Sequence, residues 1–240
     1  MARRPIFVLS HLTTELVSEI ELPLLWHSGF APSQKQKNIV ELHAAAKDRG
    51  YWPLLEVSTK SFDEVGQRLS AFNLKTCVGE DSLPIEVAFQ GSKVFEFAGP
   101  FTDLYCAEPK MARRDDRLRN SGPLVGFSFG KFTFPTKPVT AFYDWLYLSA
   151  IYPHREWLAR LDKYVGFTDI EFNPEKSVNC QARSCALFFS LLSRGLLDQA
   201  MANPEEFLDI LRTFSYMSEL PSRNRMPGSG PERQSDLALG

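Results

Sequence analysis

Two hydrophobic periods alternate along the N-terminal half of this chain. Ser33 is followed three positions later by Gln36, the spacing of a helix capping box, and apolar residues then recur at helical spacing up to Gly50. The apolar run at residues 53–57 is typical of a buried strand, and Ser61, with a glutamate three residues later, predicts a second, short helix. This alternation predicts a mixed architecture of helices and strands.

The rest of the chain continues the mixture with helices in excess. A third helix is predicted at residues 82–97, with Pro84 near its first position, where a missing amide hydrogen costs nothing. The apolar runs at 124–129 and 167–172 are typical of strands. Further helices are expected at 141–151, 155–164, 181–197 and 204–214, the last capped by Asn203. We therefore predict a helix-rich α+β fold with a small central sheet.

One domain and a tail account for the whole length. Hydrophobic residues make up 44% of the 240, enough to bury a full core, and no Pro-, Gly- or Ser-rich linker interrupts the chain before Pro221. Beyond Pro221, Gly, Pro, Ser and Arg dominate, and such a composition cannot offset the entropy of ordering by burying apolar surface. We predict one domain at residues 1–218 and a disordered tail at 219–240.

The charge balance restricts contact with nucleic acid to local patches. A formal net charge of −2 argues against a protein that coats nucleic acid, because counterion release needs a broad basic surface. The best local candidate is a run of arginines interrupted by two aspartates. By default such a run is a solvated loop, and a phosphate contact is the alternative. Its arginines are Arg113, Arg114, Arg117 and Arg119.

Cysteine and histidine spacing argue against a metal site. The four cysteines form no CxxC pair and the four histidines have no ligand spacing, so we expect neither a metal nor a cofactor. The apolar run at residues 6–9 is too short for a signal peptide or a membrane span. Free thiols without an export signal predict a cytoplasmic protein that has no membrane contact.

A narrow polar stripe marks the helix predicted at residues 82–97. Glu86, Gln90 and Lys93 stand at positions i, i+4 and i+7, so on a helix they share one face. Apolar residues cover most of the remaining surface. The spacing fits a catalytic or binding stripe, and it fits a solvent-facing stripe equally well.

The same stripe carries a resemblance to a known family. The run Glu86-Val87-Ala88-Phe89-Gln90-Gly91-Ser92-Lys93 resembles the helix signature of the NADAR superfamily, in which a Glu is followed by an aromatic-Gln pair and then a Lys. Residues 69–73 are similar to the Leu-Ser-Asn-Phe turn of that family. Ala71 stands where the family usually has Asn, and Asn73 lies one step beyond Phe72.

The order of the matching segments departs from the usual NADAR order. Residues 36–39 and 54–58 resemble a helix-then-strand pair that normally lies C-terminal to the Glu-Gln-Lys helix, and here it lies N-terminal. This order implies a circularly rearranged NADAR (YbiA-like) domain, as in the antitoxin partners of DarT-type DNA ADP-ribosylating toxins. Residues 167–174 and 179–184 also resemble that branch, so the resemblance spans roughly residues 26–200.

The resemblance implies cleavage of an N-glycosidic bond. Such cleavage develops oxocarbenium character at the ribose anomeric carbon, and a carboxylate can stabilise that charge or activate water. Glu86 and Glu56 are the candidates. A neutral lysine amine can instead attack the anomeric carbon and carry the opened sugar as a Schiff base. Lys93 is the candidate nucleophile, and its alternative is a salt bridge to Glu86 or Glu96 without a catalytic role.

The expected substrate-binding residues come from the turn, the helices and the late strand. Asp169, Glu171 and Asn173 alternate to one face of the strand predicted at 167–172 and just beyond, where they line a pocket or, at a sheet edge, merely face water. Amides and a guanidinium at the start of the following helix favour a pyrophosphate, although the arginine fits a surface charge equally well. The other candidates are Ser70, Phe72, Asn73, Gln90, Lys35, Asn179, Gln181 and Arg183.

An aromatic run at residues 142–147 is explained first by packing. Phe142, Trp145 and Leu146 have core spacing, which leaves Tyr143 or Tyr147 as a base-stacking surface.

Three functions compete on these observations. The first, implied by the resemblance, is a hydrolase that removes ADP-ribose from guanine in single-stranded DNA and so acts as antitoxin to a DarT-type toxin. The second is a non-catalytic module that binds ADP-ribose or NAD and has no need of Lys93. The third is a hydrolase of a small phosphoribosylated amine.

Overall fold

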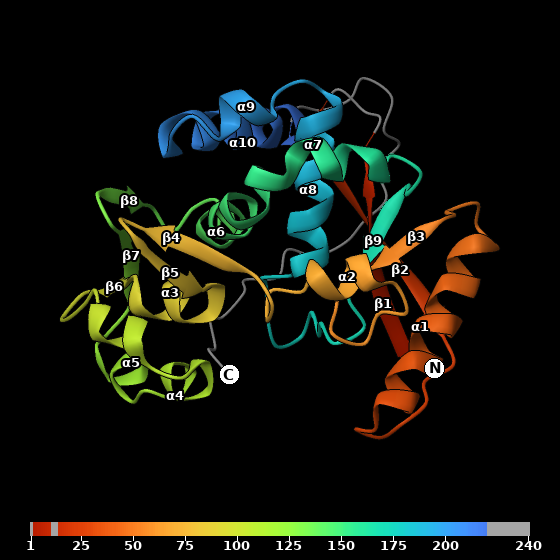
Figure 1. Ribbon diagram of the computed structural model, residues 1–240, viewed down its shortest axis with the longest axis horizontal. Coiled ribbons are helices and arrows are strands. Elements are labelled where there is room, and N and C mark those ends of the chain that lie inside the picture. Colours follow the sequence, from red (N-terminus) through yellow and green to blue (C-terminus); the bar gives the residue numbers. More distant parts are fainter. Residues whose placement is uncertain (1, 11–13, 220–240) are drawn as a thin grey trace.

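An N-terminal hairpin, which the sequence pattern did not predict, forms half of the larger sheet. The computed structural model describes residues 2–10 and 14–219. β1 (Ala2–Leu9) pairs along its full length with β2 (Val17–Leu24) in antiparallel register. On its other side β1 pairs with β9 (Gly166–Thr168), which runs parallel to β3 (Leu54–Glu56). The order β2-β1-β9-β3 leaves β3 at an edge (Figure 1).

Side chains alternate across β1 and divide the core into two clusters. Ile6 and Val8 belong to the smaller cluster, which is completed by the apolar side of α1 (Pro32–Lys47). Phe7 belongs to the larger cluster, which includes most of α8 (Gln181–Ser193). The two helices therefore cover opposite faces of the sheet.

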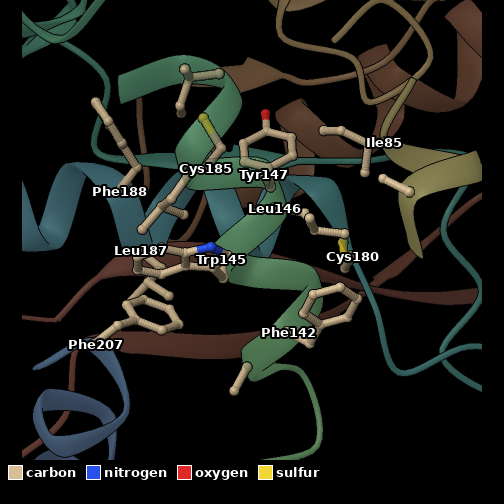
Figure 2. Close-up of a cluster of buried hydrophobic side chains, with 14 of the residues drawn as sticks. Ile85, Phe142, Trp145, Leu146, Tyr147, Cys180, Cys185, Leu187, Phe188 and Phe207 are labelled. Atoms are coloured by element: carbon tan, nitrogen blue, oxygen red, sulfur yellow. The ribbon is translucent and has the colours of Figure 1, made fainter. Parts of the chain in front are cut away.

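The middle of the larger cluster is a helix that is apolar on nearly every side. α6 (Ala141–Ile151) packs against α8 and α10 (Pro204–Glu219), and Figure 2 shows its side chains Phe142 and Leu146 within the buried cluster. A helix that is hydrophobic all round is stable only when it is buried. The hydroxyl of Tyr147 donates a 2.7 Å hydrogen bond to a backbone carbonyl, so this buried polar atom is satisfied.

Two small sheets flank the helix that carries the polar stripe. β4 (Lys75–Val78) and β5 (Asp81–Pro84) form a hairpin that leads directly into α3 (Ile85–Gly91). The chain then enters a second sheet with the order β6-β7-β8. Its strands are β6 (Lys93–Phe95), β7 (Leu124–Phe129) and β8 (Phe132–Phe134).

Short helices complete the described chain. Those before β7 are α2 (Glu64–Arg68), η1 (Thr102–Cys106), α4 (Pro109–Arg113) and α5 (Arg117–Asn120). Those after α6 are η2 (Tyr152–His154), α7 (Arg155–Leu158), η3 (Ala159–Leu161) and α9 (Leu197–Ala200).

Only one of the three predicted helix caps is present. Asn203 accepts the amide of Glu206 at 2.9 Å, so the cap of α10 is confirmed. The capping box at Ser33 is wrong, because α1 begins one residue earlier, at a proline, and no side chain caps it. The box at Ser61 is also wrong, since α2 begins at Glu64 and the Ser61 hydroxyl instead accepts an amide two residues along the chain.

The long helix predicted at 82–97 is wrong at both ends. Residues 81–84 form β5, Pro84 precedes the helix, and α3 covers only Ile85–Gly91. Ser92 ends the helix, where its hydroxyl donates to the carbonyl of Ala88 at 2.7 Å. The next residues form β6 because they pair with β7, a partner that lies far away in the sequence.

Three further elements are shorter than their patterns predicted. The strand expected at 167–172 ends at Thr168, because the backbone turns beyond it and Ile170 donates its amide to the Glu56 side chain rather than to a strand. The helix expected at 155–164 is one turn of α7 followed by η3, and the one expected at 181–197 ends at Ser193. The α+β class itself is confirmed.

Part of the predicted tail, 220–240, lies outside the described residues. The described residues include no helix long and apolar enough to cross a membrane. The single domain at 1–218 and the circular rearrangement stay predictions.

Candidate functional site

Glu86 is a partly buried carboxylate held by two neighbours. Arg113, at the end of α4, donates from Nε and Nη2 to the two Glu86 oxygens at 3.1 and 2.8 Å, and Gln90 donates from Nε2 to Oε1 at 2.9 Å. Burial opposes ionisation, but the hydrogen bonds from Arg113 and Gln90 outweigh it and lower the pKa of Glu86. Glu86 is therefore an anion at neutral pH.

Lys93 lies near this anion although it is not on the same helix. It is the first residue of β6, and its side chain folds back so that Nζ lies 5.0 Å from the centroid of the Phe89 ring on α3. Only 4% of the residue is exposed, and no group within the described chain forms a hydrogen bond or ion pair with its amine. Burial lowers the pKa of Lys93 to about 8, against the attraction of Glu86.

Gly99 allows the loop after β6 to approach the backbone of Lys93 closely. Gly99 has a φ of +103°, and a Cβ there would collide with the carbonyl oxygen of Lys93. The amide of Phe95 also donates to the carbonyl of Ala98 at 2.8 Å, which closes the loop after β6. Close approach of the two backbone segments therefore requires glycine at this position.

Gln90 leaves one buried acceptor free. Its amide nitrogen donates to Glu86, whereas its buried Oε1 has no hydrogen-bond partner among the described residues, and only 8% of Gln90 is exposed. Asn179, just before α8, likewise has a buried Oδ1 for which the described residues provide no partner. A buried acceptor without a donor costs on the order of 1–3 kcal/mol, so a bound hydroxyl or N–H group is the natural partner for each.

Tyr143 connects the Glu86 group to a second polar group. Burial raises the pKa of the Tyr143 hydroxyl well above its usual value, and the charges of Cys180, Asp169 and Glu86 add to this shift. Tyr143 is therefore within electrostatic range of both Asp169 and Glu86. Tyr143 belongs to the aromatic run that the sequence assigned mainly to packing, and it edge-packs on Phe89 with ring centroids 5.8 Å apart.

The second polar group joins the end of β9 to the turn before β4. Gln181 hydrogen-bonds to Asp169, and its Oε1 accepts the amide of Ala71 at 2.7 Å and the Ser70 hydroxyl at 3.4 Å. Burial and then the charge of Glu56 raise the pKa of Asp169 to about 8. The structure thus brings three expected binding residues together: Ser70, Asp169 and Gln181.

Glu56 lies near Asp169, and both of its carboxylate oxygens accept hydrogen bonds. Ser58 and Thr168 donate their hydroxyl hydrogens to it at 2.6 Å each, and the amide of Ile170 donates at 2.9 Å. Burial raises its pKa despite these bonds. With 2% of the residue exposed, Glu56 supports the loop that carries Asp169, and its catalytic role stays a prediction.

Arg183, on α8, already forms hydrogen bonds with two residues at the start of α6. It donates from Nη1 to the Thr140 hydroxyl and to Asp144 Oδ2, both at 2.9 Å, and Ser184 donates to the other Asp144 oxygen at 2.6 Å. Asp144 is 1% exposed, so it requires such a counter-charge. The guanidinium remains partly exposed, and its contact with a phosphate stays a prediction.

Several expected binding residues point elsewhere. Asn73 donates to the carbonyl of Gln67 at 2.8 Å and braces its own turn. Asn173 accepts the amide of Glu175 at 3.0 Å, again within a turn. The shared polar face predicted for Asp169, Glu171 and Asn173 is wrong, because these residues lie in turns beyond β9. Phe72 and Glu171 are exposed, and Lys35 lies near Trp26 on the side of α1, with Nζ 5.8 Å from the ring centroid.

Arg113 is the main site residue that sequence reasoning did not assign. It belonged to the arginine run that was expected to be a loop or a phosphate contact. The signal was present in its charge, but only the folding of α4 against α3 reveals that its partner is Glu86. In the described part of the chain, no group of three or more His, Cys, Asp and Glu side chains is placed to hold a metal ion.

Comparison with known proteins supports one family. The model of the family described as DarT1-associated NADAR antitoxin matches residues 2–220. No curated protein matches the chain. The match includes every residue of the Glu86, Lys93 and Asp169 groups, and so the chain belongs to the NADAR family of DarT1-associated antitoxins.

Proposed function

We propose that this protein removes ADP-ribose from guanine bases in DNA and thereby reverses the modification made by a DarT-type toxin. The family supports the antitoxin role. The observation that carries the chemistry is the Lys93 amine, which is buried, has no hydrogen-bond or ion-pair partner among the described residues, and has a pKa lowered to about 8. Such an amine is partly neutral at physiological pH and is a competent nucleophile. A substrate of this kind places the protein in the cytoplasm.

The proposed reaction begins with attack on the ribose. The nitrogen of Lys93 forms a bond to the anomeric carbon, the bond from that carbon to the guanine nitrogen breaks, and the base leaves with the electron pair and takes up a proton. The lysine adduct loses its proton and opens to a Schiff base. Water then adds to the Schiff base and releases ADP-ribose and the free amine, so the protein returns to its starting state.

Four neighbours assist this chemistry in the proposal. The Glu86 carboxylate stabilises the positive charge that develops at the anomeric carbon. The free Gln90 Oε1 accepts a hydrogen bond from a ribose hydroxyl, and the Oδ1 of Asn179 offers a second acceptor. Arg113, whose side chain is 56% exposed, reaches from the rim toward the diphosphate.

In this proposal the residues around Asp169 position the substrate and take no part in bond breaking. Asp169, Gln181 and Ser70 form a hydrogen-bonded bracket between β9, α8 and the turn before β4. Glu56 fixes the base of this bracket through the amide of Ile170. In this proposal Tyr143, whose ring packs edge-on against Phe89, contacts the base.

The decisive experiment is incubation with single-stranded DNA that carries ADP-ribose on guanine. Wild-type protein is expected to release free ADP-ribose and restore the unmodified oligonucleotide. Lys93→Ala should retain ADP-ribose binding and lose release, whereas Lys131→Ala, which removes an exposed lysine that also lies near a phenylalanine ring, should behave like wild type. Borohydride added during turnover should trap the Schiff base as a stable adduct on Lys93.

The rival functions give different outcomes in the same assay. Binding of ADP-ribose without any release by the wild type would identify a non-catalytic module. Release only from a small phosphoribosylated amine would identify a metabolic hydrolase. An inactive Lys93→Ala without a trappable adduct in the wild type would instead favour water activated by Glu86.

A further inference from the structure

A cavity of about 330 Å³ lies beside the edge strand β3, outside the Lys93 site. Helix α1 forms one wall, and the segments that precede β3 and β9 and the loop before α2 form the others. The volume is within the range of small-molecule sites. Six lining side chains can contact a ligand: His43, Trp52, Phe62, Asp63, Lys163 and Tyr164.

Two of the aromatic rings that line the cavity are strongly exposed to solvent, although Trp52 also contacts His43 and Lys47. Trp52 is 49% exposed and Phe62 is 61% exposed, although both line the same hollow. Tyr164 adds a third ring. Exposed rings around a cavity are typical of a surface on which planar bases stack, because every nucleobase offers a π face.

A histidine in the cavity lining has a fixed tautomer. Thr168 donates its hydroxyl hydrogen to Glu56, so the 2.8 Å bond between His43 and Thr168 must be donated by His43 Nε2. Burial lowers the pKa of His43 to about 4, so the ring is neutral and its Nδ1 is an acceptor. Such a nitrogen can receive an N–H group of a base.

Opposite charges at the rim match the remainder of a nucleotide. Asp63 accepts a 3.5 Å hydrogen bond from the Tyr164 hydroxyl and keeps a carboxylate oxygen for sugar hydroxyls. Lys163, whose Nζ lies 4.8 Å from the Tyr164 ring centroid, supplies a cation for a phosphate. A second, open hollow of about 400 Å³ also has Phe62 in its lining, together with Lys37 of α1.

We propose that this cavity is a nucleotide subsite, with the base against Trp52 and Phe62 and the phosphate near Lys163. The idea rests on the proposed function and extends it, because the hydrolase substrate offers two sources of such a nucleotide. One is the adenosine half of ADP-ribose. The other is a nucleotide of the DNA strand next to the modified guanine.

The test is calorimetric titration of the full chain with AMP, with ADP-ribose and with an unmodified single-stranded oligonucleotide. Trp52→Ala and Phe62→Ala should each weaken AMP binding by roughly 5- to 150-fold, which corresponds to the loss of one base-stacking contact. Trp157→Ala is the matched control, since Trp157 is 47% exposed and does not line the cavity. All three positions are exposed, and melting temperatures of the variants verify that they fold.

The other two ligands identify the source. Weaker ADP-ribose binding with unchanged oligonucleotide binding assigns the subsite to ADP-ribose, and the reverse pattern assigns it to the DNA strand. Equal AMP affinity in wild type, Trp52→Ala and Phe62→Ala would overturn the proposal, as would an equal loss in Trp157→Ala. Turnover of ADP-ribosylated DNA by the wild type is measured separately, so a failed subsite does not count against the hydrolase.

Discussion

The pH dependence of turnover should report the burial of Lys93. An ordinary lysine has a pKa of 10.5, and burial brings that of Lys93 to about 8. At pH 7 the neutral fraction of Lys93 is then about one tenth, which is about 300-fold more than for an unshifted lysine. Single-turnover release of ADP-ribose should therefore rise about tenfold from pH 6 to pH 7 and level off above pH 8.

Glu86→Gln should shift the pH profile of ADP-ribose release to lower pH. The negative charge of Glu86 raises the pKa of Lys93 against the larger effect of burial. Removing that charge should lower the pKa of Lys93 further, so the midpoint of the residual activity should shift to lower pH even as the rate falls.

The assay is rapid quench with ADP-ribosylated oligonucleotide, and mass spectrometry of Lys93 labelling by an amine-reactive reagent gives the same pKa without turnover. Lys131→Ala provides the control, because an exposed lysine should leave the profile unchanged. A flat profile between pH 6 and pH 8, or a midpoint that moves upward in Glu86→Gln, would refute the nucleophilic amine.

Three further changes test the surrounding groups. Gly99→Ala should destabilise the fold by about 1–3 kcal/mol in urea unfolding, because its φ is left-handed and its Cβ meets the Lys93 carbonyl; unchanged stability would contradict this. Gln90→Leu should weaken ADP-ribose binding about 2- to 10-fold in calorimetry through loss of the free acceptor, and equal affinity would remove Gln90 from the site. Asp169 has a folded pKa of about 8 against 3.8, so it binds a proton on folding in that window and its own contribution to stability should fall as pH rises from about 4 to 8. Asp169→Asn should remove this contribution, so the difference in melting temperature between wild type and variant should change with pH over that range, and parallel curves would count against the shift.

Local pattern predicted the elements whose stability is local. The bounds of α6, 141–151, and of β7, 124–129, agree with the structure, because a continuous apolar helix and an isolated apolar run need no knowledge of their partners. The β1–β2 hairpin was missed because its strands are polar at one end, with Arg3 and Arg4, and the buried run is only Pro5–Val8. Its register depends on pairing with β2 and β9, which a local window does not contain.

The candidate site shows the same division between local and distant information. Glu86 and Gln90 were predicted as helical neighbours and are hydrogen-bonded at i and i+4. Lys93 was placed near them for the wrong reason, since it reaches Glu86 from a strand that turns back at Ser92. Arg113 and the bracket of Asp169, Gln181 and Ser70 come from elements that meet only in the fold, so spacing along the chain held no information about them.

The charges of the site explain why Arg113 matters to a diphosphate substrate. Glu86 is anionic, so a substrate with two phosphate charges would meet repulsion unless cations compensate both partners. Lys93 cannot serve as the permanent cation, because burial keeps its pKa near 8 and its nucleophilic role requires the neutral form. Arg113 remains charged at any physiological pH, holds Glu86 from a largely exposed position and has a further guanidinium nitrogen free of Glu86. In the proposed reaction one guanidinium therefore keeps Glu86 ionised and also attracts the phosphates, so the neighbouring amine is not needed as a cation.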